Sequence, residues 1–227
     1  MSASTDLKQA IAHKAEQGGL FVSWTLLFVV QAGVIACAQQ PYSTLPRNYT
    51  LAFENDLVRI SRVKYSPGDK LPVHSHPSIP TVYIYLTDGG RIRFIHKTPK
   101  VTIVRDEVAA GAVRFNRNAQ VETHETEYLG DSASEYLRVE LKTRPGPPRV
   151  DARLQEDADF PWEDPQVRIS RFHGLPPEMP WPSILVNLTT NSFSWIDPKD
   201  PRPPAGSREP GWFVLLELKT DRPSSAP

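Results

Sequence analysis

Residues 81–96 read TVYIYLTDGGRIRFIH, and this stretch contains the signals that indicate the fold class. Residues 81–87 are mostly β-branched or aromatic, which favours an extended strand. The Asp-Gly-Gly triplet at 88–90 is a turn signal, because glycine adopts the positive φ angles that tight turns require. Residues 91–96 then alternate between charged and apolar side chains, as a strand with one buried face does. The stretch therefore predicts two antiparallel strands joined as a hairpin.

Short strands separated by turn signals continue on both sides of this stretch. Residues 57–63 alternate between apolar and polar side chains, which places Val58, Ile60 and Arg62 on one face. Further strands are predicted over residues 101–105, 111–115 and 136–142. Many short strands at close spacing predict an all-β fold, and residues 52–143 are expected to form one antiparallel β-barrel.

Charge and cysteine content exclude several classes of protein. The chain has 26 basic and 26 acidic residues, so its formal net charge is zero. A nucleic-acid-binding protein usually has an excess of basic residues, and we expect no nucleic-acid partner. The single cysteine, Cys37, rules out an intrachain disulfide and a zinc site built from cysteines.

The amino-terminal residues 1–38 have the pattern of a targeting segment. Residues 20–36 have no charged side chain, and Lys8 and Lys14 precede them. A signal peptide that is cleaved before a polar connector at 39–51 fits this pattern, and so does an uncleaved hydrophobic anchor helix.

Residues 34–37, Val-Ile-Ala-Cys, add a third alternative. They resemble the lipobox of bacterial lipoproteins, in which the cysteine is lipidated after cleavage, here Cys37. All three alternatives predict export to the periplasm or to the extracytoplasmic face of a bacterial membrane. The protein would contact the membrane only if the apolar segment or a lipid is retained.

A weak internal repeat divides the remaining chain. The sequence VRISR at 58–62 recurs at 167–171, and ELKT at 140–143 recurs at 217–220. The separation between the two motifs is 32 residues shorter in the second occurrence. We therefore interpret residues 160–221 as a shortened second copy of the barrel. A Pro-rich linker is expected at 144–159 and a disordered tail at 222–227. The alternative is that two edge strands of one sandwich have similar sequences.

His74 and His76 are the most informative pair of polar residues. Side chains at positions i and i+2 of a strand point to the same face, so the two imidazoles can converge on one point. Imidazole is a common ligand of Fe, Mn, Ni, Cu and Zn. The pair therefore predicts a divalent-metal site. His96, by contrast, is expected at the surface.

The spacing around this pair resembles the first motif of the cupin superfamily. That motif has a glycine, five residues, His-x-His, and a glutamate three or four residues later. Gly68, His74 and His76 match it, whereas the position of the glutamate falls at Pro80 or Thr81. The resemblance implies a cupin-type barrel, also called a double-stranded β-helix or jelly roll.

The second cupin motif is matched less well. Gly111 fits its start, and strict spacing then places Glu122 at the position of the third metal-binding histidine. His124, on the same strand face, fits that role better. Glu122 or Glu127 would be a further ligand or a proton-transfer group, as the resemblance implies.

The resemblance implies a metal-dependent protein that binds a small molecule or acts on it, with dioxygenase- or isomerase-type chemistry if it is an enzyme. Tyr83 and Tyr85 are candidates to line the substrate pocket. The second copy has no His-x-His, so the whole chain would be a bicupin with a degenerate second half. The competing interpretation is a metal-free envelope protein that binds a ligand or partner without catalysis. Exposed strand edges also allow a homodimer.

Overall fold

The computed structural model of the chain describes residues 45–117, 120–145, 162–174, 179, 181–197, 199–200 and 210–219. Every element in these ranges is a β-strand. The predicted targeting segment with Cys37, most of the predicted linker and the predicted tail lie outside the described residues. Among the described ranges we find no helix with the length and apolar character of a membrane span.

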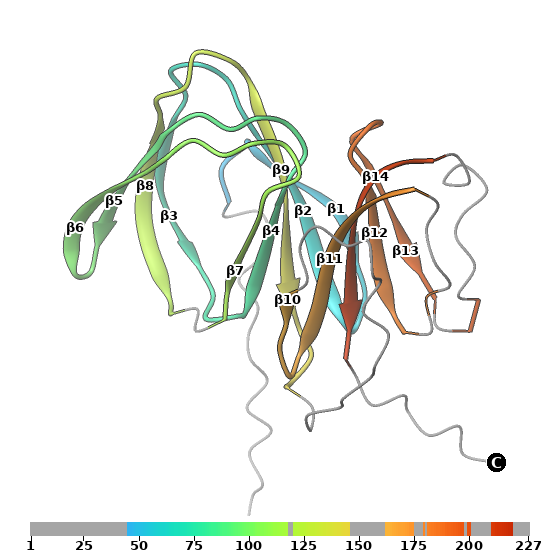
Figure 1. The fold of residues 1–227 in the computed structure, drawn as a ribbon. Coiled ribbons are helices and arrows are strands. Elements are labelled where there is room, and N and C mark those ends of the chain that lie inside the picture. Colours follow the sequence, from blue (N-terminus) through green and yellow to red (C-terminus); the bar gives the residue numbers. More distant parts are fainter. Residues whose placement is uncertain are drawn as a thin grey trace, which may run out of the picture. The chain divides into compact units, whose positions relative to one another are not determined.

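The first half of the described chain forms two antiparallel sheets that face each other as a barrel (Figure 1). The central sheet has the order β1 (Tyr49–Glu54), β2 (Val58–Tyr65), β9 (Ser134–Leu141), β4 (Thr81–Tyr85) and β7 (Val113–Asn116). The second sheet, here called the histidine sheet, has the order β3 (Lys70–His76), β8 (Glu122–Tyr128), β5 (Ile92–Lys97) and β6 (Lys100–Arg105). The predicted all-β class and cupin-type barrel are confirmed.

The predicted hairpin at 81–96 is wrong, although both of its strands exist. β4 pairs with β9 and β7 in the central sheet, whereas β5 pairs with β8 and β6 in the histidine sheet. The turn therefore carries the chain from one sheet to the other. Gly89 forms an isolated antiparallel bridge with Val108, and the Asp88 carboxylate accepts a hydrogen bond from the backbone N–H of Ala110 over 2.9 Å.

The central sheet is buried on both faces, and its inner face closes the barrel. On that face, Val63, Tyr65 and Tyr136 pack in one cluster with Leu71 and Tyr128 of the histidine sheet. Aromatic side chains therefore make up much of the barrel interior.

The outer face of the central sheet packs on a third sheet. Val58, Ile60 and Arg62 share this face, as the alternation predicts: the two apolar side chains join the core, and Arg62 donates to the Asn191 carbonyl over 2.9 Å. This third, C-terminal sheet has the order β10 (Trp162–Glu163), β11 (Val167–Gly174), β14 (Gly211–Leu218), β12 (Ser183–Asn187) and β13 (Ser192–Ile196).

The C-terminal sheet repeats the central sheet strand for strand. The two sheets have the same order when β10, β11, β14, β12 and β13 are matched to β1, β2, β9, β4 and β7. The turn before each second strand has the same hydrogen bonds. Asn55 Oδ1 accepts from the backbone N–H groups of Leu57 and Val58, and Asp164 Oδ1 accepts from those of Gln166 and Val167.

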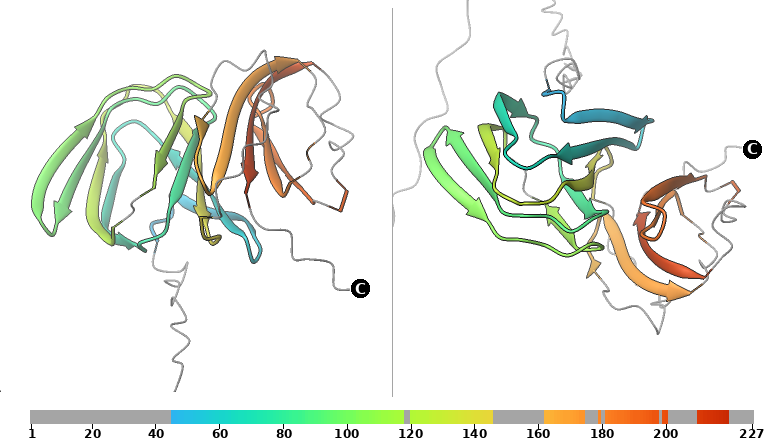
Figure 2. Two further views of the ribbon diagram at one scale, coloured as in Figure 1. Left: turned by 60° about the horizontal axis from the view of Figure 1, so that its bottom comes forward. Right: turned by 90° about the horizontal axis from the view of Figure 1, so that it is seen from above.

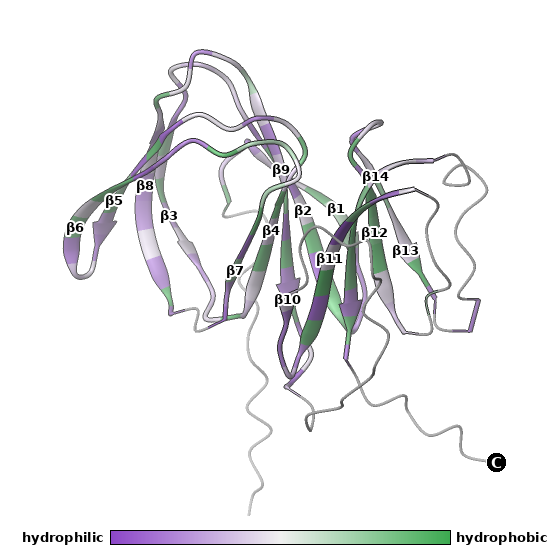
Figure 3. Ribbon diagram, viewed as in Figure 1, coloured by the Kyte–Doolittle hydropathy of each residue, from purple (hydrophilic) through white to green (hydrophobic). Residues whose placement is uncertain are grey.

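The core between these two sheets is built from equivalent positions. Seven side chains of the central sheet meet seven of the C-terminal sheet: Val58, Ile60, Val82, Ile84, Leu137, Val139 and Leu141 against Val167, Ile169, Ile184, Val186, Val214, Leu216 and Leu218. The apolar bands on the facing strands are visible in Figure 3, and Figure 2 shows the same strands from two further directions. The histidine sheet has no counterpart among the described residues of the second half. The duplication stays a prediction, and this correspondence is its main support.

Candidate metal centre

Two neighbouring strands of the histidine sheet bring three histidines together. His74 and His76 lie on β3, and His124 lies directly opposite His74 on β8. One ring nitrogen from each residue lies within 4.8 Å of those of the other two. The ring centroids are 4.7 Å apart for His74 and His124, 4.9 Å for His74 and His76, and 5.2 Å for His76 and His124.

Most ring nitrogens of this trio have no hydrogen-bond partner. The three side chains are buried, with exposed fractions of 4%, 6% and 2% for His74, His76 and His124. His74 Nδ1 contacts the Pro72 carbonyl over 2.8 Å. A carbonyl only accepts, so this nitrogen carries the proton and Nε2 presents its lone pair.

His74 Nε2, His76 Nδ1 and both nitrogens of His124 lack a partner within the described residues. Buried polar atoms without partners are unfavourable, and a coordinated metal ion would satisfy them. The residues present therefore fit a metal ion.

The protonation state suits coordination. Burial is the largest cause that lowers the pKa of all three imidazoles, and it lowers that of His124 to about 3. His74 also lowers the pKa of His76 and His124, and the buried guanidinium of Arg138 lowers the pKa of all three imidazoles. The imidazoles are therefore neutral at physiological pH, which is the form that binds metal.

A small cavity lies in front of the histidines. Its lining includes His76, His124 and four tyrosines, Tyr49, Tyr83, Tyr85 and Tyr136. The Tyr49 hydroxyl lies 3.4 Å from His76 Nε2, and burial raises its pKa well above the ordinary value. The open space is about 20 Å³, which is room for about one water molecule.

The arginine of a buried ion pair, Arg138, also lines this cavity. Arg138, on β9 of the central sheet, donates to the carboxylate of Glu140, and both side chains are almost fully buried. Burial opposes the charge of Arg138, but Tyr83 and Glu140 outweigh it and raise the pKa of the guanidinium. Since Arg138 is neutralised by its own strand, its charge is not free for a ligand.

The two candidate carboxylates, Glu122 and Glu127, lie on opposite faces of β8, because their positions differ by an odd number of residues. Glu122 shares the face of His124, lines the cavity, and places Oε2 3.7 Å from His124 Nδ1. Glu127 does not join the site, because its odd spacing from His124 turns it to the outer face. There it forms ion pairs with Lys70 over 3.2 Å and with Arg93. The hypothesis of a ligand or proton-transfer role for Glu127 therefore has no geometric support.

His96 lies next to the trio, whereas the sequence predicts a surface position for it. It lies opposite His124 on β5, is half-buried, and has its ring 5.3 Å from that of His124. The alternation along β5 predicts this position of His96, because Ile92 and Phe94 lie on the same face of the strand and line the cavity. His74, His124 and His96 thus form one row across three strands.

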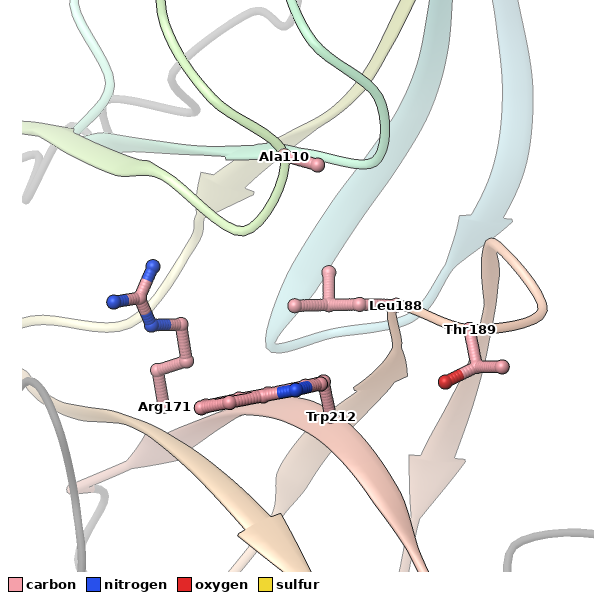
Figure 4. Close-up of a pocket in the computed structure, with 5 residues that line it drawn as sticks. All are labelled: Ala110, Arg171, Leu188, Thr189 and Trp212. Carbon is pink, nitrogen blue, oxygen red and sulfur yellow. The ribbon is translucent and has the colours of Figure 1, made fainter.

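A second, larger cavity lies at the ends of the C-terminal sheet strands. Its volume is about 370 Å³, and Ala110, Arg171, Leu188, Thr189 and Trp212 line it (Figure 4). The guanidinium of Arg171 lies 5.9 Å from the ring centroid of Trp212. These lining residues include no histidine or carboxylate, so this cavity does not resemble a metal site.

Comparisons with known proteins give likeness of fold at low identity. No family model and no curated protein matches the chain. A cupin domain from Bordetella pertussis Tohama I is 17% identical over 42% of this chain and 92% of that chain, with a TM-score of 0.36. AerE from Microcystis aeruginosa is 11% identical over 78% and 100% of the two chains, with a TM-score of 0.43. A protein with a double-stranded β-helix domain from Klebsiella pneumoniae is 15% identical over 46% and 83%, with a TM-score of 0.33.

The assignment of fold rests on the chain itself. The two facing antiparallel sheets, the His-x-His pair on β3 and the distal histidine on β8 are the features that the motif spacing predicts. Residues 49–141 thus have the fold of a cupin barrel, with a trio of histidines on its inner face.

Proposed function

We propose that His74, His76 and His124 bind one divalent transition-metal ion, and that a small molecule binds next to this ion. The observation that carries the proposal is the convergence of three buried, neutral imidazoles whose free ring nitrogens have no partner in the described chain. Imidazole ligands suit Fe, Mn, Ni, Cu and Zn, and the geometry does not select among them. Three protein ligands leave coordination positions open for water or a substrate.

A metal held in this way supplies Lewis acidity, which polarises an oxygen atom of a bound molecule. If the protein is an enzyme, the resemblance to cupins implies dioxygenase- or isomerase-type chemistry. The Glu122 carboxylate lies 3.7 Å from His124 Nδ1, beyond hydrogen-bond distance, and a shift of its side chain toward this nitrogen would fix the ring orientation of the ligand. Tyr49 is positioned to offer its phenolic proton to a group bound beside His76. Export of the protein, by signal peptide, lipidation or anchor, remains part of the proposal.

A second candidate function is a metal-free binding module without catalytic activity. Two observations favour it. The position of the motif glutamate falls at Pro80 or Thr81, and neither side chain is a carboxylate. The cavity has room for about one water molecule.

Metal content separates the two functions. The purified full-length chain is expected to hold about one transition-metal ion per chain after reconstitution. The double variant His74→Ala/His76→Ala should lose it. His173→Ala, which removes an exposed imidazole from the C-terminal sheet, and Glu127→Gln should both retain it. Absence of metal from the wild type with all five ions, together with thermal stability unchanged by chelator, would contradict the metal proposal.

A further inference from the structure

The trio of histidines lacks a negative charge. Imidazole coordinates a metal ion in its neutral form, and the motif carboxylate is missing, because its position falls at Pro80 or Thr81. The carboxylate of Glu122 lies 3.7 Å from Nδ1 of His124. A divalent ion bound here would keep most of its charge inside a buried cavity, where charge compensation is worth more than in water. Such a centre favours an anionic ligand.

A cation without an ionic partner lies at the same cavity. Arg105, at the end of β6, lines the cavity with His124 and Phe94, and its guanidinium lies 4.4 Å above the Phe94 ring. Within the described ranges Arg105 forms no ion pair. Its charge contributes to the lowered pKa of His124 and opposes the rise in the pKa of Tyr85. Unlike Arg138, this arginine is free to bind an anion.

An apolar surface continues outward from this arginine. Val101 and Ile103 lie on the same face of β6 as Arg105, opposite His96 and Phe94 of β5. Their exposed fractions are 43% and 45%, although this face is the inner face of the barrel. β6 is the edge strand of the histidine sheet. The inner surface therefore extends beyond the cavity as an open apolar rim.

We propose that the site binds a monocarboxylate with a short apolar body, whose carboxylate reaches the metal and Arg105. The cavity has room for about one water molecule, so one carboxylate oxygen takes the place of that water, and the apolar body lies over Val101 and Ile103. The inference rests on the proposed metal site and adds its ligand class. The ligand supplies the negative charge of the missing motif carboxylate.

Hexanoate, acetate and hexanol are suitable probes, titrated into the cobalt-loaded full-length chain. Calorimetry gives the affinity, and the visible absorption of cobalt reports a change at the metal. Hexanoate is expected to bind roughly tenfold more tightly than acetate, because part of its chain is buried, and to change the cobalt spectrum. Hexanol, which lacks the charge, should leave the spectrum unchanged.

Arginine variants locate the anion. Arg105→Gln should weaken hexanoate binding roughly tenfold, since a hydrogen bond to a charged group is lost. Arg93→Gln is the matched control, because Arg93 lies on the outer face of the same sheet and pairs with Glu127. Ile103→Ser should weaken hexanoate but not acetate.

The possible outcomes separate this inference from the metal proposal. A chain that takes up neither cobalt nor any of the five ions contradicts both, and a chain that takes up one of the five but not cobalt is titrated with hexanoate by calorimetry in that form. A cobalt-loaded chain whose spectrum does not respond to hexanoate, or responds equally to hexanol, contradicts the ligand class alone. A wild-type dimer that Ile103→Lys converts to a monomer, without any hexanoate binding, would show that a second copy of the chain covers the rim, and would also overturn the ligand proposal.

Discussion

His124 is the residue on which the candidate site depends most. It lies between His74 and His96 on neighbouring strands, and neither of its ring nitrogens has a partner in the described chain. The sequence predicted its place through the second motif, and strand parity predicted the convergence of His74 with His76. Strand parity also determines that Glu127 lies on the outer face of β8 and His96 on the inner face of β5. It predicts these positions only when the buried face of each strand is known.

The buried histidines make the metal-free protein sensitive to acid. An unfolded histidine has a pKa near 6.5, whereas the folded pKa of His124 is about 3. Between these values the unfolded chain binds more protons than the folded one. The free energy of unfolding therefore falls as the pH drops below about 6.5, by up to about 1.4 kcal/mol per pH unit for each such group. Above about pH 6.5 the histidines are neutral in both states, and none of this stability is lost.

Urea unfolding in chelator, over a pH series, measures this effect. His124→Asn should have a shallower slope below about pH 6.5 than the wild type. His173→Asn, which changes an exposed histidine, should keep the wild-type slope. Identical slopes for His124→Asn and the wild type would mean that His124 is not held neutral by burial.

At the scale of elements, the sequence indicated strands more reliably than their partners. Residues 81–85 and 92–97 are strands, as expected, but they belong to different sheets. Local signals such as β-branched side chains and Gly-rich turns describe the backbone nearby. β4 pairs with β9 and β7, and Val82 and Ile84 are buried in a core that extends as far along the chain as Leu218. No local pattern contains these distant contacts.

The core between the central and C-terminal sheets should be sensitive to truncation on both sides. Ile60 and Ile169 are fully buried and occupy equivalent positions. Ile60→Ala and Ile169→Ala are each expected to lower the free energy of unfolding by about 2–5 kcal/mol. Ile103→Ala, on the exposed rim of β6, should change it by less than about 1 kcal/mol. Urea unfolding measures all three, and a mild effect of Ile169→Ala would contradict the shared core.

At the scale of the whole molecule, the internal repeat was the sequence feature that related residues furthest apart in the chain. VRISR and ELKT mark paired strands in both halves, β2 with β9 and β11 with β14. The sequence did not reveal that the described residues of the second half match only the central sheet. A sheet with one large apolar face needs a partner, and here the central and C-terminal sheets cover each other.

Because the two halves share one core, they should unfold together. Four of the five tryptophans lie in residues 162–212, so tryptophan fluorescence reports mainly on the C-terminal sheet. Circular dichroism reports on all strands. The two probes are expected to give coincident urea transitions. A fluorescence transition at lower urea than the dichroism transition would show that the C-terminal sheet unfolds independently.

The metal proposal makes a definite statement about the surroundings of the ion. X-ray absorption at the metal edge of the reconstituted full-length chain reports the number and type of nearest atoms. The proposal predicts about three imidazole nitrogens, at about 2.0–2.1 Å if the ion is zinc, with oxygen atoms in the remaining positions. A first shell of oxygen alone, or an imidazole signal that persists in His74→Ala/His76→Ala, would contradict it.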